Sequence, residues 1–301
     1  MTAMVPLSGS IWRSVEAEGV ARSLYARTRA ALPFPTDDRT IQTRLGPTHL
    51  LVAGPEDAPP LLALQGGNVV NPITLAWLAP LVDRLRVVAP DTPGQPGLSH
   101  PHRPVDLEAH GGWVADVLDG VGWPSASVMG VSQGGGVAIR AAVHHPDRVT
   151  RLALVVPDGI ATPPTRAKLA LAIAYLDHRL RHRRSTVEGV ARRLSGGRDP
   201  SPDLVDAIEL SFGGTTLESQ DLPLATTQEL HGFMAPVIVI AGGRDPMFPP
   251  DRVLPRARAV FGDRVMTATL PDAGHILDAP AIGELGAALA AFLLPLGDGD
   301  G

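Results

Sequence analysis

The stretch ASVMGVSQGGGVAIRAA, residues 126–142, contains an apolar run, a glycine-rich turn and a helical pattern in direct succession. The apolar run Ala126–Gly130 predicts a buried strand, and Ala138 and Ala142 recur at helical spacing after the turn. Ser132 stands at the turn itself, within Gly-Val-Ser-Gln-Gly. A serine on such a sharp strand-to-helix turn presents its hydroxyl where the helix begins, and the flanking glycines allow close backbone approach. We therefore predict that Ser132 is a nucleophile; a glycine-rich turn without chemistry is the alternative.

A serine hydroxyl needs a base to become nucleophilic at neutral pH. The sequence has ten histidines. His275 follows the predicted strand Arg264–Leu270 in a short polar loop, Pro-Asp-Ala-Gly-His, from which a side chain can project over the edge of a sheet. Most of the others stand at the polar end of a predicted helix, in a basic segment or beside prolines. We interpret His275 as the base.

An acid must then orient the imidazole and stabilise its positive charge. Asp245 follows the apolar run Val237–Ala241 in the turn Gly-Gly-Arg-Asp-Pro, again at the carboxyl end of a predicted strand. Asp158 is the alternative acid, because it follows the apolar run Leu152–Val156 and its strand end should border the same site. We favour Asp245, and a capping or hinge residue is the other interpretation of Asp158.

Negative charge that develops on a substrate oxygen needs two hydrogen-bond donors. One is expected to be the backbone N–H of Gln133, the residue after the nucleophile. The other should come from the loop Gln-Gly-Gly-Asn that follows the apolar run Leu61–Leu64. Gly67 is the first choice because glycine lets the backbone approach a substrate closely, and Asn68 is the second. A plain glycine turn between strand and helix would give the same pattern.

Short apolar runs alternate with helical patterns from about Thr40 onward, which indicates a mostly parallel sheet flanked by helices. Gly46-Pro47 is a turn signal short enough for a hairpin, so an antiparallel start is expected. The fold class is therefore α/β. Eight strands are predicted: Thr40–Leu45, His49–Ala53, Leu61–Leu64, Arg86–Ala89, Ala126–Gly130, Leu152–Val156, Val237–Ala241 and Arg264–Leu270.

This alternation breaks between residues 158 and 233, where Pro163-Pro164, a basic run from Arg179 to Arg184 and Gly196-Gly197 interrupt short helical stretches. The segment is too long for a structureless loop in a compact domain. We expect residues 158–233 to form a small helical cap inserted after the sixth strand, while residues 1–157 and 234–301 form the core. A solvated helix face is the preferred interpretation of the basic run, rather than an anion site.

Composition bounds the possible partners. The chain has 301 residues, 44% of them hydrophobic, a formal net charge of −5 and no cysteine. Disulfides, thiolate nucleophiles and cysteine-ligated metals are thus excluded, and no overall basic field exists to recruit nucleic acid or an anionic membrane. We expect a cytoplasmic protein with a small-molecule substrate, no nucleic-acid or membrane partner, and a monomeric or homodimeric state.

Together these features resemble the α/β-hydrolase superfamily, over nearly the whole chain from Arg39 to Leu294. The lead-in Gly54–Leu61 and the stretch Ala89–Gly94 look like those of its carboxylesterase-type members. The order Ser, Asp, His along the chain is the order that the resemblance implies. Two features depart from it: Gln65 stands where the family usually has His, and Pro93–Ser99 is one residue longer than the usual Pro-Gly-x-Gly-x-Ser.

The resemblance implies a serine hydrolase that cleaves a carboxylic ester or lactone, with no metal or organic cofactor. An acid nucleophile is disfavoured because serine stands at the turn. We expect substrate contacts from Gln65 and Met247 and from the cap residues Leu171 and Tyr175. The alternative is a protein of the same fold that works without hydrolysis, either a biosynthetic cyclase or lyase or a small-molecule receptor.

Overall fold

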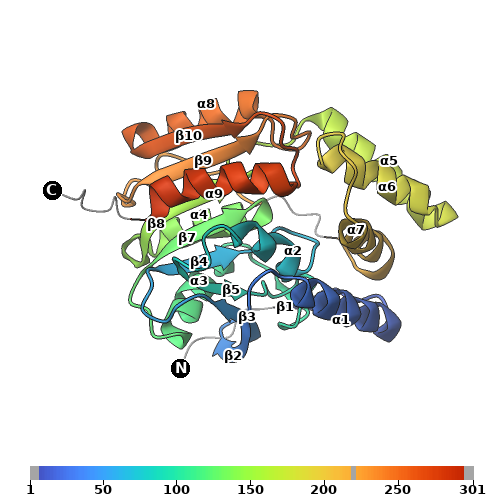
Figure 1. Cartoon of the computed structure of the whole chain (residues 1–301), viewed down its shortest axis with the longest axis horizontal. Helices are drawn as coiled ribbons and strands as arrows, with labels where there is room; N and C mark the ends of the chain where they lie inside the picture. Colours follow the sequence, from blue (N-terminus) through green and yellow to red (C-terminus); the bar gives the residue numbers. More distant parts are fainter. Residues whose placement is uncertain (1–6, 218–221, 295–301) are drawn as a thin grey trace.

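The computed structural model describes residues 7–217 and 222–294, and an eight-stranded sheet lies at its centre (Figure 1). The strand order is β10-β9-β8-β7-β4-β5-β3-β2. β3 is antiparallel to both of its neighbours, β2 and β5, and the remaining neighbours are parallel. The predicted eight-stranded, mostly parallel sheet is thus confirmed. Its strands are β2 (Asp37–Thr43), β3 (Gly46–Ala53), β4 (Pro60–Leu64), β5 (Arg86–Pro90), β7 (Ala126–Val131), β8 (Val149–Val155), β9 (Val237–Gly242) and β10 (Val265–Leu270).

The first hairpin turns two residues earlier than the sequence pattern predicts. Thr43 pairs with Gly46, so Arg44 and Leu45 form the turn, and Gly46 has a φ of 95°. The Arg44 backbone N–H and guanidinium both bind the carboxylate of Asp116, at 2.7 to 2.8 Å. This tertiary contact fixes the turn, and the strand boundaries shift with it.

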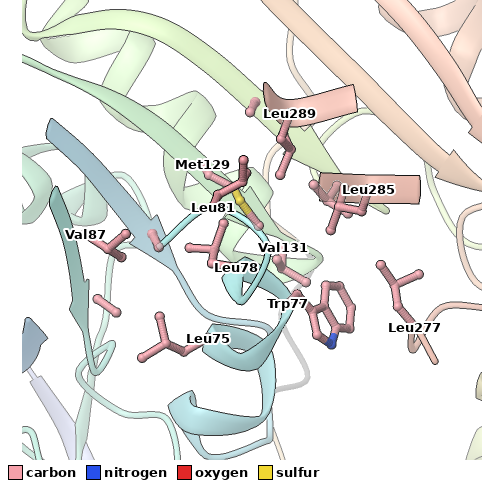
Figure 2. Close-up of a cluster of buried hydrophobic side chains, with 14 of the residues drawn as sticks. Leu75, Trp77, Leu78, Leu81, Val87, Met129, Val131, Leu277, Leu285 and Leu289 are labelled. Atoms are coloured by element: carbon pink, nitrogen blue, oxygen red, sulfur yellow. The ribbon is translucent and has the colours of Figure 1, made fainter. Parts of the chain in front are cut away.

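Apolar side chains cover both faces of the sheet, as the continuous apolar run of β9 requires. Val237 and Val239 pack into one cluster with side chains of α3 (Ala109–Gly120), α4 (Gln133–His144) and α8 (Pro250–Phe261). Ile238 and Ile240 point the other way, into a cluster with α2 (Asn71–Leu75), the 3₁₀ turn η1 (Ala76–Leu78) and α9 (Ala279–Leu293). Figure 2 shows this second cluster, where Trp77 and Leu78 lie near Leu285 and Leu289.

Helix α1 (Val15–Ala30) and a small antiparallel sheet of β1 (Leu7–Ser10) and β6 (His102–Pro104) were not predicted. Ser14 caps α1 by accepting from the N–H of Ala17. Arg27 near its other end binds Asp203 and Asp206 of helix α7 (Pro202–Gly214) at 2.8 and 2.6 Å. This helix therefore packs against a partner almost two hundred residues later in the chain.

Between β8 and β9, the described residues form three helices: α5 (Thr165–Arg181), α6 (Arg184–Leu194) and α7 (Pro202–Gly214). They share an apolar cluster built on Val187, Ala191 and Phe212. Figure 1 shows the three helices to one side of the sheet, with α7 next to α1. The division into a core and a cap stays a prediction. Among the described residues, no helix is both long enough and apolar enough to cross a membrane.

Candidate active site

Ser132 stands between β7 and α4. Its backbone has a φ of 50°, a conformation that residues other than glycine rarely adopt. Two glycines make this turn possible. A Cβ on Gly130 would lie 2.2 Å from the carbonyl oxygen of Gly134, and a Cβ on Gly134 would lie 2.4 Å from that of Leu64. The N–H of Ser132 donates to Val155 of β8 at 3.0 Å. The sharp turn at Ser132 therefore packs against β4 and is hydrogen-bonded to β8.

His275 lies against this serine. Its Nε2 is 3.0 Å from Ser132 Oγ, and its side chain is 12% exposed. The loop that carries His275 is hydrogen-bonded to the end of α6, because the N–H of Ile276 donates to the carbonyl oxygen of Leu194 at 3.0 Å. Gly274 allows this contact, since a Cβ there would lie 2.3 Å from the Leu194 carbonyl oxygen. The position of the imidazole thus depends on the inserted helices as well as on β10.

Asp245 completes a continuous line of side chains. Its Oδ2 is 2.9 Å from His275 Nδ1, and its side chain is fully buried. The other carboxylate oxygen accepts the backbone N–H groups of Met247 and Phe248 at 2.7 and 3.0 Å. These bonds fix the carboxylate and leave Oδ2 directed at the imidazole. The structure therefore brings Ser132, His275 and Asp245 together in one line of hydrogen bonds.

The electrostatics of His275 reflect competing effects on its pKa. Burial favours the neutral imidazole and lowers the pKa, but the charge of Asp245 and its hydrogen bond raise it. The charge of Asp158 raises it further. These carboxylates outweigh burial, so the pKa of His275 lies above its usual value. The imidazolium is thus stabilised at this position.

Asp158, the alternative acid, lies close to Ser132, to which it is joined through the backbone. Its backbone N–H donates to the carbonyl oxygen of Ser132 at 2.9 Å, and its Oδ1 accepts the N–H of Gly159 at 2.6 Å. The carboxylate that hydrogen-bonds His275 Nδ1 is that of Asp245. Asp158 therefore acts on the imidazole through its charge.

The loop of residues 65–68, which we call the donor loop, packs against the turn that carries Ser132. A Cβ on Gly66 would lie 3.9 Å from the Cβ of Ser132, and a Cβ on Gly67 would lie 2.1 Å from Gln133 Oε1. The backbone of this loop is thus close to the first N–H of α4, which belongs to Gln133. Asn68 is placed differently, because its backbone N–H donates to Oε1 of Gln95 at 2.7 Å. The backbone N–H of Asn68 is thus already engaged, and the donor role of Gly67 and Gln133 stays a prediction.

Gln65, expected from the sequence to contact substrate, hydrogen-bonds backbone groups through its side-chain amide. It is buried, its Nε2 donates to Val69 at 2.8 Å, and its Oε1 accepts the N–H of Thr92 at 3.1 Å. Both ends of the amide are engaged with backbone, so Gln65 joins the donor loop to the loop after β5. These bonds fix the two loops relative to each other.

Gln95 is a residue that the sequence reasoning missed. Its side chain is buried and accepts from Asn68, so it holds the donor loop from the other side. The signal was present in the lengthened stretch Pro93–Ser99, of which Gln95 is part. Ser211 of α7 adds a third contact to the same loop, because its hydroxyl donates to the Asn68 carbonyl oxygen.

The other expected substrate residues lie at varying positions. Met247 is half-buried and stands two residues after Asp245, whose carboxylate accepts its backbone N–H. Leu171 and Tyr175 pack into the cluster shared by α5, α6 and α7, where the Tyr175 ring meets Phe212 edge-on at 5.5 Å. Ile276, the neighbour of His275, contacts the same cluster. Leu171 and Tyr175 therefore hold the helical segment together.

The arrangement can perform proton transfer from a hydroxyl to an imidazole that a carboxylate orients, next to backbone donors at a helix start. Nucleophilic acyl transfer requires these same groups: a nucleophile, a base and hydrogen-bond donors for the developing negative charge. Within residues 7–217 and 222–294, no group of three or more His, Cys, Asp or Glu side chains is placed to hold a metal ion.

Comparisons with known proteins agree with this fold. A family model for the alpha/beta hydrolase fold matches residues 59–183. Carboxylesterase YbfK of Bacillus subtilis (strain 168) is 25% identical over 264 residues, which cover 84% of this chain and 86% of that protein. The uncharacterized carboxylesterase nap of the same strain is 24% identical over 270 residues, covering 84% and 85%. The crystal structure of carboxylesterase CesB (YbfK) from Bacillus subtilis has a TM-score of 0.82 at 23% identity, covering 93% of this chain and 99% of that one.

Proposed function

We propose, on the premise that this chain belongs to the α/β-hydrolase superfamily, that it hydrolyses a carboxylic ester or lactone of a small molecule through an acyl-enzyme on Ser132. One observation carries the proposal, namely the line of hydrogen bonds from Asp245 through His275 to Ser132. Both relatives described above are named carboxylesterases, which favours an ester as the substrate.

In the first step, Ser132 Oγ attacks the substrate carbonyl carbon while His275 Nε2 accepts the hydroxyl proton. The carbonyl oxygen becomes negatively charged and accepts from the N–H groups of Gln133 and Gly67. Asp245 holds the proton on His275 Nδ1, which leaves Nε2 free to act as the base, and it stabilises the imidazolium. The carbon–oxygen bond of the ester then breaks, and the alcohol leaves with the proton from Nε2.

In the second step, His275 takes a proton from water, and the resulting hydroxide attacks the acyl carbon. The bond between the acyl carbon and Ser132 Oγ then breaks, and Oγ takes the proton back from His275 Nε2. The acid product leaves and ionises to a carboxylate. One oxygen atom of the carboxylate therefore comes from water. For a lactone the same steps open the ring, so that the alcohol and the acid stay in one molecule.

We further propose that residues 158–233 act as a cap that shapes the substrate pocket. Two contacts support this role: Ser211 of α7 binds the donor loop, and Leu194 of α6 binds the loop of His275. Loops at the carboxyl ends of parallel strands border the site in folds of this kind. The cap would then select the acyl or alcohol group while the sheet supplies the chemistry.

Turnover in ¹⁸O-labelled water tests the function directly. A panel of p-nitrophenyl esters of different chain lengths and a panel of lactones supply the substrates, and mass spectrometry reads the acid product. We expect one labelled oxygen in the carboxylate, with no label above background when Ser132→Ala replaces the native chain. A product isomeric with the substrate, or one cleaved without solvent oxygen, would establish the cyclase or lyase alternative instead.

A further inference from the structure

Helix α5 exposes four large apolar side chains on one side. Leu169, Ile173, Leu176 and Leu180 are 59%, 60%, 57% and 72% exposed. Their spacing of four, three and four residues places them along a single face of the helix. We call these four residues the apolar stripe. Monomeric proteins rarely expose a contiguous apolar row of this kind unless it meets another surface.

The apolar stripe is not a core face that has turned outward. The opposite face of α5 carries the packing residues: His178 is buried, and Leu171 and Tyr175 lie in the apolar cluster with α6 and α7. The orientation of the helix is thus fixed by one face, and the fold of the described residues does not use the other. In Figure 1, α5 lies beyond the end of the sheet together with α6.

Positive charge surrounds the apolar stripe. Residues 166–184 contain six Lys or Arg residues and one Asp. Arg166 and Lys168 are exposed at the start of α5, and Arg181 and Arg183 are exposed at its end. The acid, Asp177, is itself engaged by Arg181 at 2.5 Å and by the hydroxyl of Thr186. Arg181 and Asp177 thus neutralise each other. Arg166 at one end and Arg183 at the other supply positive charge beside the stripe.

Acidic groups of the neighbouring helices face Arg184. Arg184 binds Asp206 at 2.8 Å and Glu209, both on α7, and lies 3.8 Å from Glu188 on α6. These pairs lie at the α6 end of the run and neutralise Arg184 there. They leave the positive charge of Arg166 and Arg183 beside the apolar stripe.

We propose that the apolar stripe of α5 docks on an anionic lipid surface. An amphipathic helix with leucine and isoleucine on one face and arginine or lysine beside it lies in the plane of such a surface. The apolar side chains enter the acyl boundary, and the long cationic side chains reach back to the phosphate groups. The expectation of no membrane partner rested on the net charge of −5, which averages over the whole surface and hides this local excess of cations.

A second copy of the chain fits the apolar stripe less well. Cations stand at both ends of the stripe, so a partner α5 would face cation with cation in a parallel and in an antiparallel arrangement alike. Such like-charge contacts oppose association. An anionic surface instead meets the positive charge at both ends of the stripe.

Vesicle flotation tests the proposal. Full-length protein is mixed with phosphatidylcholine vesicles or with vesicles that also contain phosphatidylglycerol, and the floated fraction is measured. We expect flotation with the anionic vesicles and at least about tenfold less with the neutral ones, because both the apolar and the electrostatic contributions are needed. Raised salt should lower flotation because it screens the arginine charges.

Matched variants assign the binding to α5. Ile173→Gln combined with Leu176→Gln should lower flotation with anionic vesicles by about tenfold or more, since polar amides replace the apolar anchors. Met266→Gln is the control, because Met266 is 57% exposed, as Leu176 is, but lies on β10. Arg166→Gln combined with Arg183→Gln should weaken binding to anionic vesicles without changing the melting temperature.

Three results would overturn the proposal. The first is no flotation with anionic vesicles, and the second is an equal loss in the Met266→Gln control. The third is a dimer in sedimentation velocity that the Ile173→Gln, Leu176→Gln variant abolishes while flotation is unaffected. That last result would assign the apolar stripe to a second copy of the chain. None of these measurements depends on the proposed hydrolase activity.

Discussion

Nδ1 of His275 lies 2.9 Å from Oδ2 of Asp245, although the two residues are carried by loops after different strands. β9 and β10 are parallel neighbours, and Gly242 is level with Leu270 at their carboxyl ends. Each loop therefore starts from the same edge of the sheet, and a few residues bring the carboxylate to the imidazole. The contact follows from strand order, which explains why both residues could be recognised as strand-end residues in the sequence.

Replacing the acid tests this contact. Asp245→Asn should lower kcat by about 10⁴-fold, because a neutral amide favours the wrong imidazole tautomer and cannot stabilise imidazolium. Steady-state hydrolysis of a p-nitrophenyl ester measures the loss. Asp158→Asn is the matched control and should be far milder, since the carboxylate of Asp158 acts on His275 through charge. The reverse ranking of the two variants would move the acid to Asp158.

The pH dependence of activity follows from the raised pKa of His275. The imidazole accepts a proton only when neutral, so activity is full above this pKa and is lost as the pH falls through it. Because carboxylates raise the pKa, the acid limb of kcat/KM should lie above the ordinary histidine value of about 6.5. Asp158→Asn should shift the limb to lower pH, since it removes a nearby negative charge. A limb that stays in place, or moves to higher pH, argues against this electrostatic account.

Gln95 is predicted to position the donor loop through Asn68. Gln95→Met keeps the side-chain length but removes the acceptor, so Gly67 should lose its fixed place near the developing charge. We expect kcat and kcat/KM to fall together by roughly tenfold to a hundredfold, because the lost interaction acts in the transition state. A variant that raises KM alone would show that Gln95 contributes to substrate binding instead.

Two residues on α5 should respond differently to truncation. Leu171→Ala removes a side chain from the cluster shared by α5, α6 and α7, and should lower the free energy of unfolding by about 1–3 kcal/mol. Ile173→Ala truncates an exposed side chain of the same helix and should change stability by less than about 0.5 kcal/mol. Denaturant titration compares the two. Equal effects would mean that the two faces of α5 are not partitioned as the structure has them.

Much of the core could be predicted because its signals are local. The run Val237–Gly242 is apolar throughout, so both faces of its strand had to be covered. The glycines around Ser132 likewise indicate a turn that no bulkier residue could form. In both cases a few consecutive residues contain the whole physical reason for the structure.

The unpredicted parts depend on contacts between distant segments. Helix α1 is stabilised by Arg27 binding Asp203 and Asp206, which no local pattern reveals. β6 is three residues long and pairs with residues near the start of the chain. Gln95 and Asn68 are 27 residues apart, so the role of the glutamine becomes visible only when the two loops meet.

The central claim is that the Ser132 hydroxyl forms the acyl-enzyme, and the kcat of Ser132→Ala on the best ester substrate tests it most directly. Alanine preserves the backbone of the sharp turn at Ser132 as nearly as any residue with a Cβ, so substrate binding should survive. We predict a loss of about 10⁶-fold in kcat, equivalent to about 8 kcal/mol of barrier. A Ser132→Ala protein that keeps a substantial fraction of the native kcat would contradict the account.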